Sequence, residues 1–124
     1  MQTRQQQWVQ AAFKQVEEFV APYRNQGKLP KELPVALSNY RSFALSFPAL
    51  IHTCGLAQAI AFAKYKSEPL LEHLEGILHT DGQLADLSRT VPLQHYMLLS
   101  QQTLDAACWL KRYAEALIPV EREQ

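Results

Sequence analysis

Apolar side chains recur along this chain at the three- and four-residue spacing of an α-helix, without the sustained alternation that marks a half-buried β-strand. Glycine supplies only 4 of the 124 residues, so few positions interrupt that spacing. Apolar residues make up 48% of the chain and charged residues 19%, which is enough apolar surface for one core and argues against disorder. The sequence therefore predicts an all-α protein, a compact single-domain bundle of about five to six helices.

The length of the chain sets its domain organisation. A chain of 124 residues is too short for a TIM barrel or for two lobes with a cleft between them, so residues 1–124 are expected to form one helical domain. The ends, residues 1–4 and 120–124, are expected to fray. Residues 83–90 are expected to form either a loop or a short helix.

Proline, glycine and capping residues bound the individual helices. Pro48 predicts a break over residues 46–48, because proline is tolerated in the first turn of a new helix. Ser100 is a good N-cap for a final helix. The pattern predicts helices over about residues 8–24, 35–45, 48–66, 68–80, 91–99 and 100–118.

The helix predicted over residues 48–66 is apolar nearly all round, which is typical of a buried, central helix. Gly55 lies inside it, where glycine costs about 1 kcal/mol relative to alanine. We expect close approach of a neighbouring helix to offset that cost.

Charge is balanced overall but not along the chain. Lys plus Arg and Asp plus Glu each number 12. Residues 1–66 hold 8 basic and 3 acidic side chains, a net of +5, whereas residues 67–124 hold 4 basic and 9 acidic ones, a net of −5. A molecule with two oppositely charged halves can dock head to tail or offer one face to a polyanion.

Nothing in the sequence predicts a membrane or secreted location. The first residues lack the apolar stretch of a signal peptide, and the most apolar segment, residues 54–63, is far shorter than the roughly 20 residues of a membrane span. Two cysteines, Cys54 and Cys108, are too few for a disulfide framework. We expect a soluble, cytoplasmic protein with reduced thiols.

The sequence predicts no enzyme, metal or cofactor. His52 and Cys54 are two residues apart and cannot chelate one ion from a helix, and no glycine-rich phosphate loop is present. One enzymatic alternative stays open. Arg89 and His95 have the loose spacing of the Arg/His pair in helical ribonucleases of the HEPN fold, although Val91-Pro92 between them is expected to break the alignment.

Several basic residues of the first half have a tyrosine as sequence neighbour, as at Tyr23, Tyr40 and Tyr65. Cations beside aromatic rings suit RNA as well as ordinary packing. Lys111-Arg112 adds a second, smaller basic spot in the acidic half. The basic residues of the first half are Arg24, Lys28, Lys31, Arg41, Lys64 and Lys66.

Two sequence blocks resemble the small-subunit family of the Cmr complex, the type III-B CRISPR effector. The first block is FPALIHTCGLAQAIAFAKYK, residues 47–66, and the second is WLKRYAEA, residues 109–116. The order and spacing of both blocks fit the family pattern. The chain departs from that pattern at Cys54, where we expect Asn, and at His52, where we expect a stronger cation.

The resemblance implies an all-helical, non-catalytic subunit that contributes to antiviral defence. Several copies would stack as a short filament along the duplex of guide RNA and target RNA, beside the backbone subunits and the large polymerase-like subunit. Other subunits would cleave the target.

Residue chemistry gives that role a mechanism. A-form RNA hides its bases, so a sequence-independent partner contacts the phosphates through a basic face. A heterologous contact between the acidic half of one copy and the basic half of the next would build the filament. A purely structural helical spacer is the second alternative. The residues expected to contact RNA are Arg24, Lys28, Arg41, Lys64 and Lys66, together with Lys111 and Arg112.

Overall fold

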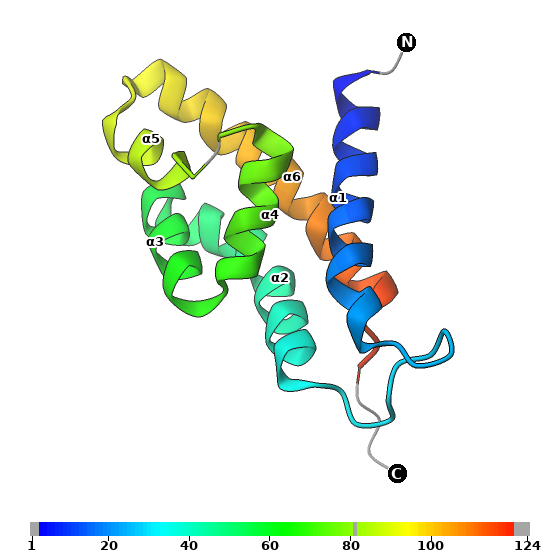
Figure 1. Ribbon diagram of the computed structural model, residues 1–124. Coiled ribbons are helices and arrows are strands. Elements are labelled where there is room, and N and C mark those ends of the chain that lie inside the picture. The colour runs from blue at the N-terminus through cyan, green and yellow to red at the C-terminus, as the bar shows by residue number, and fades with distance from the viewer. Residues whose placement is uncertain (1–2, 81, 121–124) are drawn as a thin grey trace.

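The computed structural model describes residues 3–80 and 82–120, which form helices joined by turns and one longer connection (Figure 1). Apart from an isolated bridge between Asn25 and Lys28, this part of the chain holds no β-structure. The predicted all-α bundle is confirmed. The elements are α1 (Arg4–Val20), the 3₁₀ turn η1 (Ala21–Tyr23), α2 (Val35–Cys54), α3 (Leu56–Lys66), α4 (Glu68–Leu78), α5 (Leu84–Thr90) and α6 (Leu93–Leu117).

The longest helix, α6, organises the bundle. It runs diagonally across the molecule from the α5 end to the C-terminal end and packs most extensively against α2 and α1 (Figure 1). It also contacts α4 and α5. The core side chains are aliphatic and aromatic, and the largest fully buried ones are Tyr40, Phe47, Leu37, Leu56, Ile60, Leu70, Leu74, Ile77, Leu84, Leu110, Ile118 and Val16.

The prediction of a central helix in the middle of the chain is wrong. α3 lies at the side of the bundle, and its Phe62 and Tyr65 side chains are 48% and 83% exposed. Its sequence is apolar on every face largely because it contains several alanines, whose small side chains do not decide which face of a helix is buried. The central position belongs to α6, whose amphipathic stripe is longer.

The helix break lies at Gly55 and not at residues 46–48. α2 continues through Pro48, which is buried. The prolyl nitrogen cannot donate to the Ala44 carbonyl, so one helical hydrogen bond is lost there, and core packing on both sides of Pro48 keeps the helix continuous. Gly55 instead adopts φ 85° and ψ 165°, a conformation essentially restricted to glycine, and ends α2 while starting α3.

A tyrosine of α6 closes this break. The Tyr96 hydroxyl oxygen accepts a hydrogen bond from the Leu56 backbone N–H at 3.0 Å and lies 3.4 Å from the Ala57 backbone nitrogen. These N–H groups belong to the first turn of α3, which has no carbonyl partner for them. The expected close approach at Gly55 is therefore present, with a Cβ at Gly55 lying 3.4 Å from the Tyr96 oxygen.

Residues 91–118 were expected to form two helices but form one. Ser100, the predicted N-cap, lies inside α6, and its buried hydroxyl has no hydrogen-bond partner among the described residues. The helix instead starts after Pro92, with the Tyr96 N–H bonded to the Pro92 carbonyl at 2.8 Å. Local capping preference is weaker than the packing of a continuous α6 stripe against α1 and α2.

The N-terminal end of the described chain is held by specific bonds. Thr3 forms a capping box with Gln6, each residue bonding the other across the first turn of α1. Residues 83–90 were expected to form a loop or a short helix, and Leu84–Thr90 form the short helix α5. Residues 1–2 and 121–124, which belong to the expected frayed ends, lie outside the described residues.

One polar pair sits inside the core. The Tyr40 hydroxyl and His73 Nδ1 lie 2.6 Å apart, and Phe19 packs against both rings. Burial lowers the pKa of His73 to about 4 and raises that of Tyr40. Both side chains are therefore neutral at pH 7. In the described ranges 3–80 and 82–120 no helix is both long and apolar enough to cross a membrane.

Candidate nucleic-acid interface

The structure distributes the cations predicted to contact RNA over several places instead of one basic face. The connection between α1 and α2, which carries Arg24 and Lys28, lies on the opposite side of the molecule from α3, which carries Lys64 and Lys66 (Figure 1). Arg41 lies on α2, and Lys111 and Arg112 lie on α6. The net charge of a sequence segment does not predict this scatter, because the basic residues of one segment can lie on different faces of the folded molecule.

Arg24 is occupied by an internal ion pair. Its guanidinium donates to both carboxylate oxygens of Glu17, with Nη2 and Oε2 3.2 Å apart. The hydrogen bond from Arg24 lowers the pKa of Glu17 and raises that of Arg24. The pair ties the 3₁₀ turn back to the last turns of α1, so Arg24 has a structural partner.

Lys28 lies on a tight turn at the tip of the same connection. Asn25 and Lys28 exchange two backbone hydrogen bonds of 2.8 and 3.1 Å, and Gln26 and Gly27 between them have φ of 53° and 77°. The turn exposes the Lys28 side chain to solvent. Lys28 is thus free to bind a partner but stands apart from the other predicted contacts.

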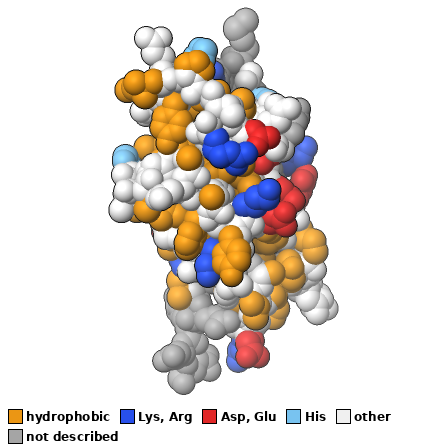
Figure 2. Space-filling model, turned by 90° about the vertical axis from the view of Figure 1, so that its left-hand side faces the viewer, with side chains coloured by type: hydrophobic (Ala, Val, Ile, Leu, Met, Phe, Trp, Pro, Cys, Tyr) orange, Lys and Arg blue, Asp and Glu red, His pale blue; other side chains and the backbone are white. Residues whose placement is uncertain are grey.

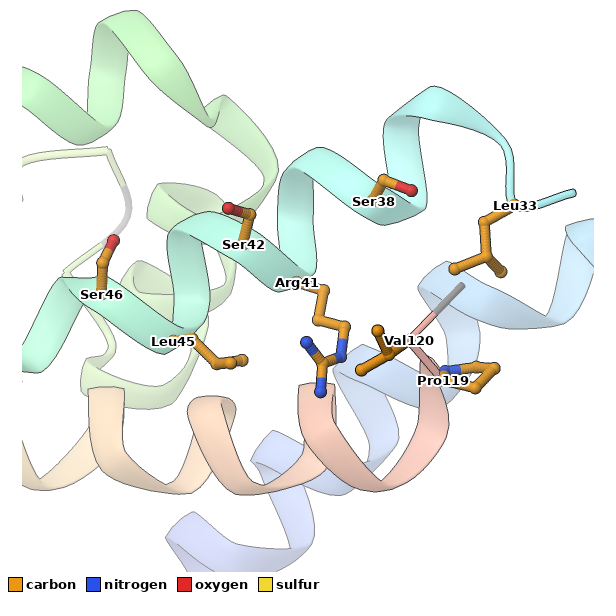
Figure 3. A pocket seen from close by; sticks show the side chains of 8 residues that line it. All are labelled: Leu33, Ser38, Arg41, Ser42, Leu45, Ser46, Pro119 and Val120. Atoms are coloured by element: carbon orange, nitrogen blue, oxygen red, sulfur yellow. The ribbon is translucent and has the colours of Figure 1, made fainter. Parts of the chain in front are cut away.

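Arg41 anchors the C-terminal segment. Its Nε donates to the Ile118 carbonyl at 2.8 Å, and Figure 3 shows its guanidinium lying between α2 and Pro119-Val120. The side chain is half-buried and lines a pocket of about 430 Å³. The pocket is formed by Leu33, Ser38, Arg41, Ser42, Leu45, Ser46, Pro119 and Val120.

The end of α3 presents the most exposed group of predicted contacts. Lys64, Tyr65 and Lys66 are all exposed, and the Lys66 Nζ lies 5.4 Å from the ring centroid of Tyr65 and 5.9 Å from that of Phe62. Cations suit the last turn of a helix because its carbonyl ends carry partial negative charge. α3 therefore ends in a cationic and aromatic surface.

Arg89 of α5 joins this surface, although it was not among the predicted RNA contacts. A pocket of about 540 Å³ separates α3 from α5, with Lys64 and Tyr65 on one wall and Arg89 and Ser88 on the other. Arg89 also pairs with Asp86 one turn earlier in α5. The face of the molecule on this side shows Lys and Arg side chains gathered near its middle, among apolar side chains and next to Asp and Glu (Figure 2). We call Lys64, Tyr65, Lys66 and Arg89 the α3–α5 patch.

Arg89 and His95, the pair of the ribonuclease alternative, lie on two different helices. Arg89 lies in the last turn of α5, lines the α3–α5 pocket and pairs with Asp86. His95 is exposed in the first turn of α6, after Val91 and Pro92. Within the part of the chain that the structure describes, no group of three or more His, Cys, Asp or Glu side chains could hold a metal ion.

Lys111 and Arg112 lie near the other end of α6, and Arg112 lines a pocket with residues of α1. Arg112 is exposed, and its guanidinium carbon lies 5.4 Å from the centroid of the Trp109 ring. Lys111 is half-buried. These two residues therefore belong to a different surface from the α3–α5 patch.

The chain is similar to known proteins over nearly its whole length. The family model described as CRISPR-associated protein (Cas_Cmr5) matches residues 4–117. The CRISPR system Cmr subunit Cmr5 of Thermus thermophilus is 35% identical over 124 aligned residues, covering 95% of this chain and 98% of that protein. The crystal structure of a CRISPR-associated Cmr5 family protein from Thermus thermophilus superposes with a TM-score of 0.75 at 33% identity, covering 96% of this chain and 100% of that one.

Proposed function

The chain belongs to the Cmr5 family of CRISPR-associated proteins, and from that premise we propose that it is the non-catalytic small subunit of a type III-B Cmr effector complex. In this role it stacks with further copies of itself along the duplex of guide RNA and target RNA and contacts the RNA backbone. Its protein partners are the large polymerase-like subunit and the backbone subunits of that complex, and the complex serves antiviral defence.

The α3–α5 patch is the observation that supports RNA contact most directly. Lys64 and Lys66 are solvent-exposed, and an aromatic side chain, Tyr65, lies between them in sequence. Exposed ammonium groups can each neutralise one phosphate, and the exposed Arg89 guanidinium can bond two phosphate oxygens once it leaves Asp86. Because A-form RNA offers its phosphates and 2′-hydroxyls but not its major-groove base edges, such a patch binds without sequence preference, and pairing with the guide supplies the selection.

Apolar side chains at the two ends of the molecule support stacking of copies. Leu93, Met97 and Leu98 in the first two turns of α6 are 72%, 63% and 55% exposed, and Val35 at the start of α2 and Val120 after α6 are 73% and 62% exposed. The starts of α6 and α2 lie at opposite ends of the molecule (Figure 1). Two different patches at opposite ends favour a head-to-tail contact, which builds a filament and not a closed dimer. Phosphate contacts then add up over the linked copies.

Neutralising the patch tests RNA contact. Replacing Lys64→Gln and Lys66→Gln removes two phosphate contacts from each copy, so the slope of log affinity against log salt for binding of target RNA by the whole complex should fall by about two for every copy that contacts the RNA. The control with the same charge change is Lys14→Gln with Lys31→Gln, both exposed and outside the patch. Equal salt slopes for the two double variants would overturn the assignment of the patch.

Two further measurements test the alternatives. Cross-linking the assembled complex to target RNA should give an adduct on this chain, and an absent adduct would favour the purely structural spacer. Labelled RNA incubated with the purified protein should stay intact. Cleavage that disappears in a His95→Ala variant would contradict the non-catalytic role and favour the ribonuclease.

A further inference from the structure

A third pocket, between α1 and α6, combines the two tryptophans of the chain with two arginines. Its volume is about 350 Å³. Trp8 and Arg4 come from the first two turns of α1, and Trp109 and Arg112 from the second half of α6. The pocket, which we call the α1–α6 pocket, is lined by Arg4, Gln5, Trp8, Asp105, Cys108, Trp109 and Arg112.

The planar groups of this pocket are already ordered by their neighbours. The guanidinium carbon of Arg4 lies 5.4 Å from the Trp8 ring centroid, and that of Arg112 lies 5.4 Å from the Trp109 ring centroid. Trp109 also stacks on Tyr113, with centroids 6.2 Å apart and an interplanar angle of 23°. Both indoles are half-buried. A ligand would therefore meet fixed rings, which lowers the entropic cost of binding.

Within the described part of the chain the two arginines are not held in ion pairs, although Asp105 lines the same pocket. Among residues 3–80 and 82–120, no carboxylate lies within ion-pair distance of Arg4 or Arg112. When the Gln102 side-chain amide is turned so that its oxygen faces Arg4, that oxygen accepts from Nη2 at 3.1 Å and Nη1 at 3.3 Å. A neutral amide orients the guanidinium without neutralising it, so Arg4 remains able to bind an anion.

We propose that the α1–α6 pocket binds one unpaired nucleotide of RNA. Its base lies against the ring of Trp8 or Trp109 or against the guanidinium plane stacked on that ring, and its phosphate binds Arg4 and Arg112. Aromatic side chains and guanidinium planes are the surfaces on which proteins stack splayed-out RNA bases. An adjacent arginine supplies the bidentate contact that a phosphate needs. Charged and amide groups on the wall favour such a polar ligand over an apolar protein side chain.

Asp105 gives the pocket a base preference. A carboxylate accepts hydrogen bonds and cannot donate them when ionised. Cytosine carries an exocyclic amine that can donate, whereas uracil presents a carbonyl oxygen at the same position. The two bases have the same ring size, so a difference in their affinity measures the hydrogen bond to Asp105. We expect cytidine nucleotides to bind more tightly than uridine nucleotides.

This inference rests on the proposed function only in taking RNA as the ligand, because the pocket and the α3–α5 patch share no residue. The patch contacts phosphates of paired RNA. The α1–α6 pocket needs a base that has left its stack, which a duplex does not offer. The two sites therefore respond to different RNAs.

Intrinsic tryptophan fluorescence reports on this pocket, because both tryptophans of the chain line it. Trp109 also lines a neighbouring hollow with Gln5, Gln6, Val9 and Gln10, so variants of the two pocket arginines are needed to locate the ligand. The full-length protein is titrated with 5′-CMP, with 5′-UMP, with a cytidine-rich unpaired oligoribonucleotide and with the same strand annealed to its complement. We expect saturable quenching by CMP and by the unpaired strand, weaker quenching by UMP, and none by the duplex. The single-strand arm distinguishes an RNA site from a site for free nucleotides, which would respond to CMP only.

Single variants separate the pocket from general charge effects. Arg4→Gln and Arg112→Gln should each raise the Kd of the unpaired strand about tenfold. Both side chains are exposed, so helicity measured by circular dichroism should stay unchanged. Lys14→Gln, which removes one charge from the same helix α1 outside the pocket, should bind like the wild type.

Three results would overturn the proposal: no quenching by the unpaired strand, equal quenching by strand and duplex, or unchanged binding in both arginine variants. Quenching that appears only when the protein assembles with other subunits, in the absence of RNA, would assign the pocket to a protein contact instead. Equal affinity for CMP and UMP would overturn the role of Asp105. Loss of quenching with intact salt-dependent duplex binding would remove this site and leave the proposed function standing.

Discussion

Burial of a single histidine makes the stability of the fold depend on pH. His73 has a folded pKa of about 4, below its unfolded value of 6.5, because burial disfavours the charged imidazolium. Between these two pH values the unfolded chain binds the proton and the folded chain does not. The contribution of His73 to the free energy of unfolding should therefore be fully present above pH 6.5. The free energy of unfolding should fall by about 3 kcal/mol as pH drops from 6.5 toward 4.

Urea unfolding at a series of pH values measures this effect. A His73→Phe variant should lose the part of the pH dependence that belongs to the imidazole. It should also be less stable at pH 7 by about 1–3 kcal/mol, because the buried Tyr40 hydroxyl loses its partner. An unchanged pH profile in this variant would contradict the assignment to His73.

A second residue-scale prediction concerns Gly55. Its φ of 85° with ψ of 165° is strained for any residue with a Cβ, and an added Cβ would also lie 3.4 Å from the Tyr96 hydroxyl oxygen. Gly55→Ala should therefore destabilise the protein by about 1–3 kcal/mol in thermal or urea unfolding. Gly27→Ala is the matched control, since Gly27 has a φ of 77° but no atom within 4 Å of an added Cβ. Equal losses in the two variants would show that contact with Tyr96 adds nothing.

At the scale of the element, the N-terminus of α3 depends on a side chain from α6. Tyr96→Phe removes the oxygen that bonds the Leu56 N–H and leaves the first turn of α3 without that cap. The expected loss is about 1 kcal/mol in the free energy of unfolding. Tyr113→Phe on the same helix is the control, because its hydroxyl has no hydrogen bond in the described part of the chain. Hydrogen exchange should show faster opening of α3 in Tyr96→Phe and not in the control.

Helix content could be predicted from the sequence, but helix boundaries within long apolar stretches could not. Periodicity placed helical structure correctly around α1, α4 and the second half of α6. It misplaced the breaks, because local signals at Pro48 and Ser100 are worth about 1–3 kcal/mol each and core packing overrides them. Gly55 carries the break because Tyr96, far along the chain on α6, can reach the backbone beside it, and sequence periodicity contains no such long-range contact.

The candidate sites were partly predictable for the same reason. Lys64 and Lys66 could be named because charges in the last turn of a helix are exposed by default. Arg24 and Arg41 could not be judged, because a bond to Glu17 or to the Ile118 carbonyl depends on how distant elements meet. Arg89 was missed as part of the patch because the path of α5 past α3 is a tertiary feature.

At the scale of the whole molecule, exposed apolar ends predict self-association. Leu93→Glu with Met97→Glu places two charges on the apolar start of α6 without touching the core, since both side chains are more than half exposed. In a stack each copy would bury these charges against its neighbour, so the number of copies per assembled complex should fall, as measured by native mass spectrometry. Gln94→Glu, exposed on the same turn of α6, is the single-charge control. An unchanged copy number would place the contact elsewhere.

The hydrogen bond across the α2–α3 break has a consequence for how this protein can diverge. The hydroxyl at position 96 has this acceptor role only where the chain turns at position 55, and the Leu56 amide beside that turn loses its protein partner unless an acceptor stands at position 96. Substitution at one position removes the selective reason for keeping the other. Among related sequences, glycine at position 55 and tyrosine at position 96 should therefore be kept or lost together, so that the two positions co-vary although they are far apart in the sequence.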